Sequence, residues 1–394
     1  MFKSNNKLIS FIIYIFLLIP FFRITYLVVM YPQTELVYKI WQIISILIIF
    51  VILMKYGKYS KFLNYFIVYF ILLMLSTVLN NADVPGCIFL AIRTIGLCMI
   101  VDYGIKRDAK VFLNAFEFFL SVLVYINLFS VIIFKDGMYI NSTVGYTENW
   151  ILGYRNLHIL YILPAILVSF INSYYKEGKL TIRNYILLIA SYLSIYLVKS
   201  GTSLIGMTII VGLLILNNIF KKIKLLNIKN YFLAYIILFL AIVIFRIQNL
   251  FEYIIVDILN RDLTLTGRIY IWDYVIEFIK ERPILGYGVE DSILRLNKTS
   301  FMVSTHAHDQ ILEIIYKSGI VGSSIYFIIL IKSIIELYKY KESKIAQILS
   351  IVMFAYLFMM LTEFFSLDLI MFLFVFCLDI KFFAKEGENN ETIN

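Results

Sequence analysis

Hydrophobic runs of 18 or more residues recur along the whole chain of 394 residues, and they limit its fold more than any other feature. A soluble core does not need runs of this length, whereas a helix needs about 20 apolar residues to cross a bilayer. The composition agrees, with 61% hydrophobic residues, 15% charged residues and a mean hydropathy of +0.87. We therefore predict an all-α polytopic membrane protein with about twelve transmembrane helices. They lie near residues 8–30, 36–54, 62–79, 84–101, 111–134, 151–173, 184–198, 203–220, 231–246, 311–331, 345–361 and 365–383.

Lysine and arginine are concentrated in every second connection between these runs, and this alternation predicts the orientation of the chain. Basic loops stay on the cytoplasmic side of a membrane. Both termini are therefore expected to be cytoplasmic, and the connections at residues 80–83, 135–149, 247–310 and 362–366 are expected to face outward. The formal net charge of +9 follows from the basic loops, so it does not indicate nucleic-acid binding.

The outward connection at residues 247–310 is much longer than an ordinary connection between helices, so we expect it to have a function. It divides the chain into four predicted parts. A bundle of about nine helices at residues 1–246 precedes this large extracytoplasmic loop, and a bundle of about three helices at residues 311–384 follows it. A cytoplasmic tail is predicted at residues 385–394.

An amphipathic helix is predicted inside the loop, because apolar residues recur at helical spacing between Gly267 and Arg282. We expect this helix to lie on or near the outer bilayer surface. Pro283 ends it, and Gly286 and Gly288 predict a tight turn after it. Such a turn either brings backbone N–H groups close to a ligand or simply returns the chain to the membrane.

Two of the three histidines, His306 and His308, stand just before the membrane helix predicted at residues 311–331. If that helix already included them, His306, Asp309 and Glu313 would share one face. A bilayer tolerates such a face only toward a cavity or a polar seam. This geometry favours His306 as the residue in the cavity, but a helix that starts at or after His308 removes the preference.

Four other ionisable residues lie at the depth of the predicted membrane helices, namely Arg93, Glu117, Arg155 and Glu363. Buried charge is costly, so each is a candidate functional residue, with a structural ion pair as the alternative. Arg155 stands at the outer end of its predicted span. It could therefore share an outward cavity with the long loop.

Taken in order, the motifs of this chain resemble those of the O-antigen ligase and polymerase superfamily. Its members include Wzy-type capsular and O-antigen polymerases and the ligases that attach O-antigen to lipid A core. The motifs are Gly153-Tyr154-Arg155-Asn156, Gly267-Arg268-x-x-x-Trp272, Arg282-Pro283-Ile284-Leu285-Gly286-Tyr287-Gly288, His308-Asp309-x-x-Leu312-Glu313 and Gly319-Ile320-Val321-Gly322. Two positions depart from the family. Family members commonly have asparagine where this chain has Asp309. They also have a Ser-Arg-Gly-like segment where this chain has Lys199-Ser200-Gly201-Thr202, so Lys199 is the candidate to replace the positive charge of that arginine.

The resemblance implies transfer of a glycan from undecaprenyl diphosphate to a sugar hydroxyl on another lipid-linked repeat unit. The departing lipid diphosphate needs cationic stabilisation, which the planar fork of arginine provides. Arg155 and Arg268 are the first residues implied for this role, and Arg282 is the third. Arg93 and Lys199 are further candidates.

The acceptor hydroxyl is a poor nucleophile, so the implied chemistry needs a neutral histidine as base. The family position implies His308, whereas helical geometry favours His306, and Glu313 would orient the base from one turn below. We expect no cofactor. No repeated acidic cluster indicates a catalytic metal, although Glu290-Asp291 and the histidine pair keep a metal site as a minor alternative.

The leading hypothesis is a polysaccharide polymerase on the outer face of the cytoplasmic membrane of a bacterium. It would join undecaprenyl-diphosphate-linked repeat units for capsule, O-antigen or exopolysaccharide synthesis. A ligase with the same site is the nearest alternative, and a flippase or other transporter is the alternative from another class. The expected partners are the lipid-linked oligosaccharide and membrane lipid, with the chain-length regulator and flippase of the pathway as further candidates and no nucleic acid.

Overall fold

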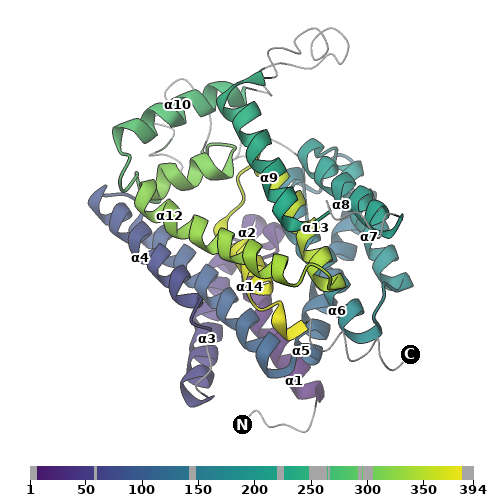
Figure 1. Cartoon of the computed structure of the whole chain (residues 1–394). Helices are drawn as coiled ribbons and strands as arrows, with labels where there is room; N and C mark the ends of the chain where they lie inside the picture. The colour runs from purple at the N-terminus through teal and green to yellow at the C-terminus, as the bar shows by residue number, and fades with distance from the viewer. Residues whose placement is uncertain are drawn as a thin grey trace.

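A computed structural model describes residues 7–56, 60–141, 148–219, 226–247, 264, 267–291, 295 and 305–383. The predicted tail and most of residues 248–304 lie outside this part of the chain. The described residues are mainly helical, as expected of an all-α membrane protein (Figure 1). The α-helices are α1 (Lys7–Leu18), α2 (Thr25–Met30), α3 (Gln33–Tyr56), α4 (Leu63–Leu79), α5 (Val84–Ile133), α6 (Ile159–Glu177), α7 (Ile182–Leu197), α8 (Gly201–Ile219), α9 (Ile228–Phe239), α10 (Arg268–Glu281), α12 (Gln310–Lys339), α13 (Lys344–Met359) and α14 (Met371–Leu378). Short 3₁₀ or π segments are η1 (Ile19–Phe21), η3 (Arg155–Leu157), η4 (Leu240–Ile244) and η7 (Leu367–Leu369).

Four of the described helical segments are long and apolar enough to cross a membrane by length and composition alone. They are Gln33–Lys55, Val84–Ile133, Arg155–Glu177 and Gln310–Lys339. Several other apolar helices are shorter, at 10–17 residues. These helices support a multi-pass membrane protein, while the number of spans stays a prediction.

Helix breaks explain why the hydrophobic runs and the helices do not correspond one to one. The run at residues 8–30 is divided by η1, which contains Pro20, and continues in α2. The runs at 84–101 and 111–134 are joined in α5, which kinks at Asp108, where φ is −157° and ψ is 77°. The Asp108 carboxylate accepts a hydrogen bond from the N–H of Val111 at 3.1 Å, so it caps the second half of α5.

A small antiparallel sheet precedes α6, and the sequence pattern did not predict it. Strands β1 (Tyr139–Ile140), β2 (Glu148–Trp150) and β3 (Gly153–Tyr154) pair in that order. Trp150 is buried, and its indole N–H donates to the carbonyl of Phe134 at 2.7 Å. The membrane helix predicted at residues 151–173 therefore begins only at Ile159, and Arg155 precedes α6.

Three of the predicted outward connections meet at one end of the helix bundle. The N–H of Asp83 donates to the carbonyl of Val289 at 2.8 Å, which joins the first of them to the long connection. The side chain of Gln310 accepts from the N–H of Phe365 at 2.8 Å, which joins the long connection to residues 362–366. Helix α10 lies across this end, beside α12 (Figure 1). The side of the membrane that this end faces stays a prediction.

Helix α10 was predicted between Gly267 and Arg282 and extends from Arg268 to Glu281. Its apolar face is covered by protein, because Trp272 and Val275 are buried in a cluster with side chains of α12 and the turn that follows α10. Tyr270 and Tyr274 are exposed on the same helix. The apolar face therefore attaches α10 to the bundle instead of being presented to lipid.

The Pro-Gly turn after α10 packs against a break in α12. Helix α12 is interrupted at Gly319, where φ is 57° and ψ is −168°, a region that only glycine adopts readily. The N–H groups of Tyr287 and Gly288 donate to carbonyls of α12 at 2.8 Å, and the N–H of Ile320 donates to the carbonyl of Pro283 at 2.8 Å. The turn therefore satisfies backbone groups that the break leaves unpaired, so these two N–H groups are used in folding and not in binding a ligand.

We predict that Gly319→Ala will strongly destabilise the protein. A Cβ at this position would lie 2.2 Å from the carbonyl oxygen of Ile284, and the backbone conformation also disfavours alanine. We expect the free energy of unfolding to fall by roughly 2–5 kcal/mol, measured as thermal unfolding in detergent. Gly212→Ala in α8 is the matched control, because a Cβ there meets no atom within 4 Å and alanine favours a helix. Equal transition temperatures for the two variants would show that the close contact is not rigid.

Candidate active site

The carboxylate of Glu363 connects three of the predicted motifs. Its Oε1 accepts hydrogen bonds from Arg268 at 2.6 Å and from the amide of Asn156 at 3.1 Å. Its Oε2 lies 3.8 Å from Nδ1 of His308. Glu363 follows α13, Arg268 begins α10, Asn156 lies in η3 and His308 precedes α12. Elements from four parts of the chain therefore meet at one acidic side chain.

Glu363 is nearly buried, and its charge is balanced by its neighbours. Burial alone would raise the pKa of this carboxyl, but His308 and the Arg268 guanidinium hold that pKa below its ordinary value. Glu363 is therefore ionised at neutral pH. An ionised carboxylate can both hold the Arg268 guanidinium in place and attract the N–H of an imidazole.

The histidine pair lies outside α12, which begins at Gln310 after the N-cap residue Asp309. The shared face of His306 and Glu313 was conditional on a helix that included the histidines, and this condition is not met because neither histidine is in α12. His308 has a φ of 50°, and the two imidazole rings are 4.1 Å apart between centroids. The preference for His306 that rested on helical geometry no longer applies.

The two histidines differ in exposure. Burial, and then the neighbouring His308, lower the pKa of His306 to about 4, so His306 is neutral at pH 7 but a weak base. The side chain of His308 is 28% exposed, and Nδ1 has no hydrogen-bond partner among the described residues. At 3.8 Å from Glu363, Nδ1 is beyond hydrogen-bond distance, although catalytic contacts often shorten when substrate binds.

Asp309 stands where the resemblance leads one to expect asparagine. Its Oδ1 accepts from the N–H of Leu312 at 2.8 Å, while Oδ2 is buried and has no partner in the described part of the chain. Burial raises the pKa of Asp309 to about 8, so the side chain is mainly a neutral carboxylic acid at pH 7. A neutral carboxylic acid resembles an asparagine amide in shape and charge, which explains how this position accommodates the exchange.

Glu313 fixes the backbone between the two histidines. Its buried carboxylate accepts from both terminal nitrogens of Arg295, each at 2.9 Å, and from the N–H of Ala307 at 2.7 Å. Lys317 forms a further ion pair with it at 2.9 Å. Glu313 thus constrains the peptide at Ala307, which lies between His306 and His308 in sequence.

Arg155 and Lys199 lie beside this network through their neighbours in the chain. Arg155 is exposed, and its Nε donates to the hydroxyl of Tyr154 at 3.0 Å. Asn156, the next residue, contacts Glu363 and also accepts from the hydroxyl of Ser200 at 2.9 Å. Lys199 is exposed immediately before Ser200. The side chains of Arg155 and Lys199 form no contact with Glu363 that the structure describes.

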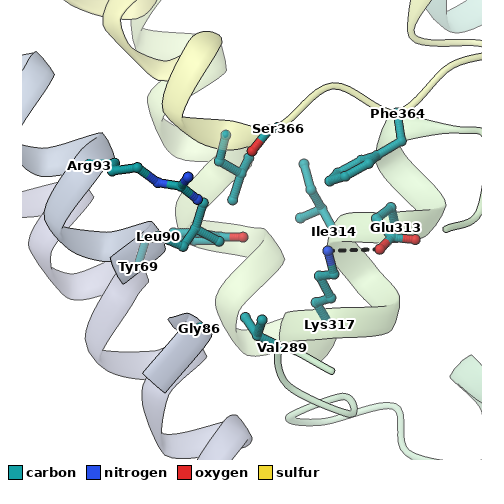
Figure 2. Close-up of a pocket in the computed structure, with 11 residues that line it drawn as sticks. Tyr69, Gly86, Leu90, Arg93, Val289, Glu313, Ile314, Lys317, Phe364 and Ser366 are labelled. Carbon is teal, nitrogen blue, oxygen red and sulfur yellow. Dashed lines mark ion pairs between the residues drawn. The ribbon is translucent and has the colours of Figure 1, made fainter. Parts of the chain in front are cut away.

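Arg282 and Arg93 lie elsewhere. Arg282 follows the C-terminal end of α10, with its guanidinium 4.7 Å from the ring centroid of Tyr287. Because α10 has 14 residues, Arg282 is about 20 Å from Arg268 along the helix axis. One diphosphate cannot contact both. Arg93 pairs with Asp368 at 3.3 Å and lines a cavity together with side chains of α12 (Figure 2).

Glu363 and Arg295 complete the site. Glu363 was a candidate functional residue in the sequence, as an ionisable group at the depth of the predicted membrane helices, but it was assigned no role. Arg295 was not predicted, because it lies in the long loop without a recognisable motif. Among the described residues, no group of three or more histidine, cysteine, aspartate or glutamate side chains is arranged to hold a metal ion.

Comparison with known proteins gives one family match. Residues 186–327 match the model of the O-antigen ligase family. The matched segment contains Lys199, Arg268, Arg282, His306, His308 and Glu313, whereas Arg93, Arg155 and Glu363 lie outside it. The search of curated proteins found no match.

Proposed function

We propose that this chain, whose residues 186–327 match the O-antigen ligase family, is a polysaccharide polymerase of the O-antigen ligase and polymerase superfamily. The proposed substrates are two undecaprenyl-diphosphate-linked oligosaccharides at the outer face of a bacterial cytoplasmic membrane. The observation that supports this proposal best is the convergence of Arg268, Asn156 and His308 on Glu363. It brings a cation suited to a phosphate close to a histidine that can act as a base.

Arg268 is proposed to bind the donor diphosphate, with Arg155 approaching from η3 and Lys199 as an additional cation. Only the NH2 nitrogen of Arg268 is hydrogen bonded to Glu363, so other N–H donors of the guanidinium can contact phosphate oxygens. The negative charge on the leaving group increases as the glycosyl bond breaks. A fixed guanidinium at that point stabilises the transition state more than the ground state.

His308 is proposed to be the base. The acceptor hydroxyl oxygen attacks the anomeric carbon of the donor, its proton passes to His308, and the carbon–oxygen bond to the diphosphate breaks with the electron pair leaving on the lipid diphosphate. Glu363 near Nδ1 favours a tautomer that leaves Nε2 as the acceptor of the proton, and it stabilises the imidazolium that forms. His306 packs against this ring and, because burial lowers its pKa, is assigned a supporting role.

A ligase would use the same residues with a different acceptor, and it is the alternative within the superfamily. A flippase or other transporter receives no support from the family match. The substrate sugars, the undecaprenyl carrier and partners of the same pathway remain part of the proposal.

Reconstitution is the experiment that tests this function. We expect the purified chain, in phosphatidylcholine vesicles with synthetic polyprenyl-diphosphate repeat units, to produce a ladder of longer glycans on a gel. Vesicles without the protein are the control. Transfer to lipid A core alone would indicate a ligase. Movement of lipid-linked sugar across the vesicle membrane without any longer glycan would contradict the proposal and favour a transporter.

A further inference from the structure

A small cavity lies beside the histidine pair, between α4, α5 and α12. Its volume is about 240 Å³, and it is lined by Tyr69, Gly86, Leu90, Arg93, Val289, Glu313, Ile314, Lys317, Phe364, Ser366 and Leu367. Figure 2 shows Arg93 extending from α5 and the Lys317–Glu313 ion pair extending from α12 into the same space. Arg93 and Lys317 bring two cations from different helices to one cavity.

Phe364 connects this cavity to the Glu363 network. The Phe364 ring, which lines the cavity, lies 5.6 Å from the ring of His306, and Nζ of Lys317 lies 4.6 Å from its centroid. Glu363, the preceding residue, contacts Arg268 and approaches His308. The histidine pair is therefore close both to the proposed diphosphate site and to the cavity.

The two cations that line the cavity each have an acidic partner. Arg93 pairs with Asp368 at 3.3 Å, and Lys317 pairs with Glu313 at 2.9 Å. Lys317 shares the Glu313 carboxylate with Arg295, which already forms a bidentate pair with it. A largely buried ammonium that shares its carboxylate with a second cation can also bind an anionic ligand.

Arg93 is also incompletely satisfied. Its Nε is 3.3 Å from Asp368, but this buried nitrogen has no hydrogen-bond partner in the described part of the chain. Charged donors that are buried normally find an acceptor, so a carboxylate or phosphate from a ligand would complete the coordination of this guanidinium.

We propose that this cavity binds an acidic monosaccharide, such as a hexuronate, at the end of the acceptor glycan. Its carboxylate would contact Arg93 and Lys317, its hydroxyls would contact Glu313 and Ser366, and the rings of Tyr69 and Phe364 would flank its apolar faces. The inference rests on the proposed function for the identity of the acceptor. It adds the substrate class, namely repeat units that carry an acidic sugar.

Size and charge favour a single sugar over a diphosphate. The cavity is smaller than the roughly 300–1,000 Å³ of pockets that enclose drug-sized ligands, so it admits one ring and not a whole repeat unit. One carboxylate can contact both Arg93 and Lys317, which line the same cavity. A sugar bound here would also place its hydroxyls near the histidine pair, whereas the diphosphate of an acceptor lies several sugars away from its reactive end.

The test measures binding and does not require turnover. Full-length protein in phosphatidylcholine nanodiscs is titrated with methyl glucuronide and with methyl glucoside, which lacks the carboxylate, by saturation-transfer NMR. We expect at least about tenfold tighter binding of the glucuronide, the effect of one charge-assisted hydrogen bond. Arg93→Gln and Lys317→Gln should each remove this preference. Lys332→Gln, on the exposed part of the same helix, is the matched control and should retain it.

Asp368→Asn distinguishes a binding residue from a structural ion pair. If Arg93 binds the ligand, removing the competing carboxylate should tighten glucuronide binding. If the Arg93–Asp368 pair only stabilises the packing of the helices, Asp368→Asn and Arg93→Gln should both weaken glucuronide binding. That result would contradict the proposal. Equal affinity for the two sugars, or tighter binding of inorganic phosphate at the same site, would also overturn it. Arg268→Lys should leave glucuronide binding intact, so failure of the transfer reaction and failure of this site give different results.

Discussion

Replacing His308 with glutamine should lower glycan extension by roughly 10²–10⁴-fold, the range expected for loss of a general base. Glutamine is similar in size and polar, but it cannot take up the proton of the acceptor hydroxyl. His308 is partly exposed, and Nδ1 has no partner to lose among the described residues, so expression and thermal stability should change little. The measurement is the initial rate of chain extension in reconstituted vesicles.

His306→Gln is the comparison for this variant. His306 is buried, and its lowered pKa makes it a poor base, so the variant should lose less activity than His308→Gln. The N–H of His308 donates to Nδ1 of His306 at 3.3 Å, and glutamine retains an acceptor at that point. A greater loss in His306→Gln, with both proteins folded, would move the base from His308 to His306.

Arg268→Lys should reduce extension by about 10²–10³-fold, although the positive charge is retained. A guanidinium can hold Glu363 with one nitrogen and a phosphate with the others, whereas a lysine ammonium is a point charge that cannot reproduce this geometry. The 2.6 Å contact with Glu363 would also be weakened. We expect the loss mainly in kcat, measured as extension rate at saturating lipid-linked substrate, because the charge on the diphosphate increases in the transition state.

Arg282→Lys is the same substitution about 20 Å away at the other end of α10. Arg282 is exposed and contacts the ring of Tyr287, so its replacement should have a much smaller effect on extension. Equal losses in the two variants would show that the diphosphate does not bind where we place it.

Glu363→Gln tests the contact between Arg268 and Glu363. Combined with Arg268→Lys, it should lower activity by less than the product of the two separate losses, because the two residues contact each other.

Local patterns in the sequence predicted the helical parts of the structure well. The periodicity and Pro283 placed α10 within one residue at each end. The same reasoning failed where the chain breaks a helix for a tertiary reason. The interruption of α12 at Gly319 depends on backbone contacts with a turn that lies more than thirty residues earlier in the chain. The pattern of hydrophobic residues along the sequence carries no information about such a contact.

By itself, the sequence determined that the chain is an apolar helical protein, which motifs it carries and which charged residues are candidates, because composition, periodicity and turn residues act locally. Only the tertiary structure decided which of those charges meet. Glu363 is separated from Arg268 by 95 residues and from Asn156 by 207. The start of α12 at Gln310 left both histidines outside the helix, and the length of α10 separated Arg282 from Arg268. The physical reason is that the energy of a buried charge depends on its partner and on solvent, which long-range packing supplies.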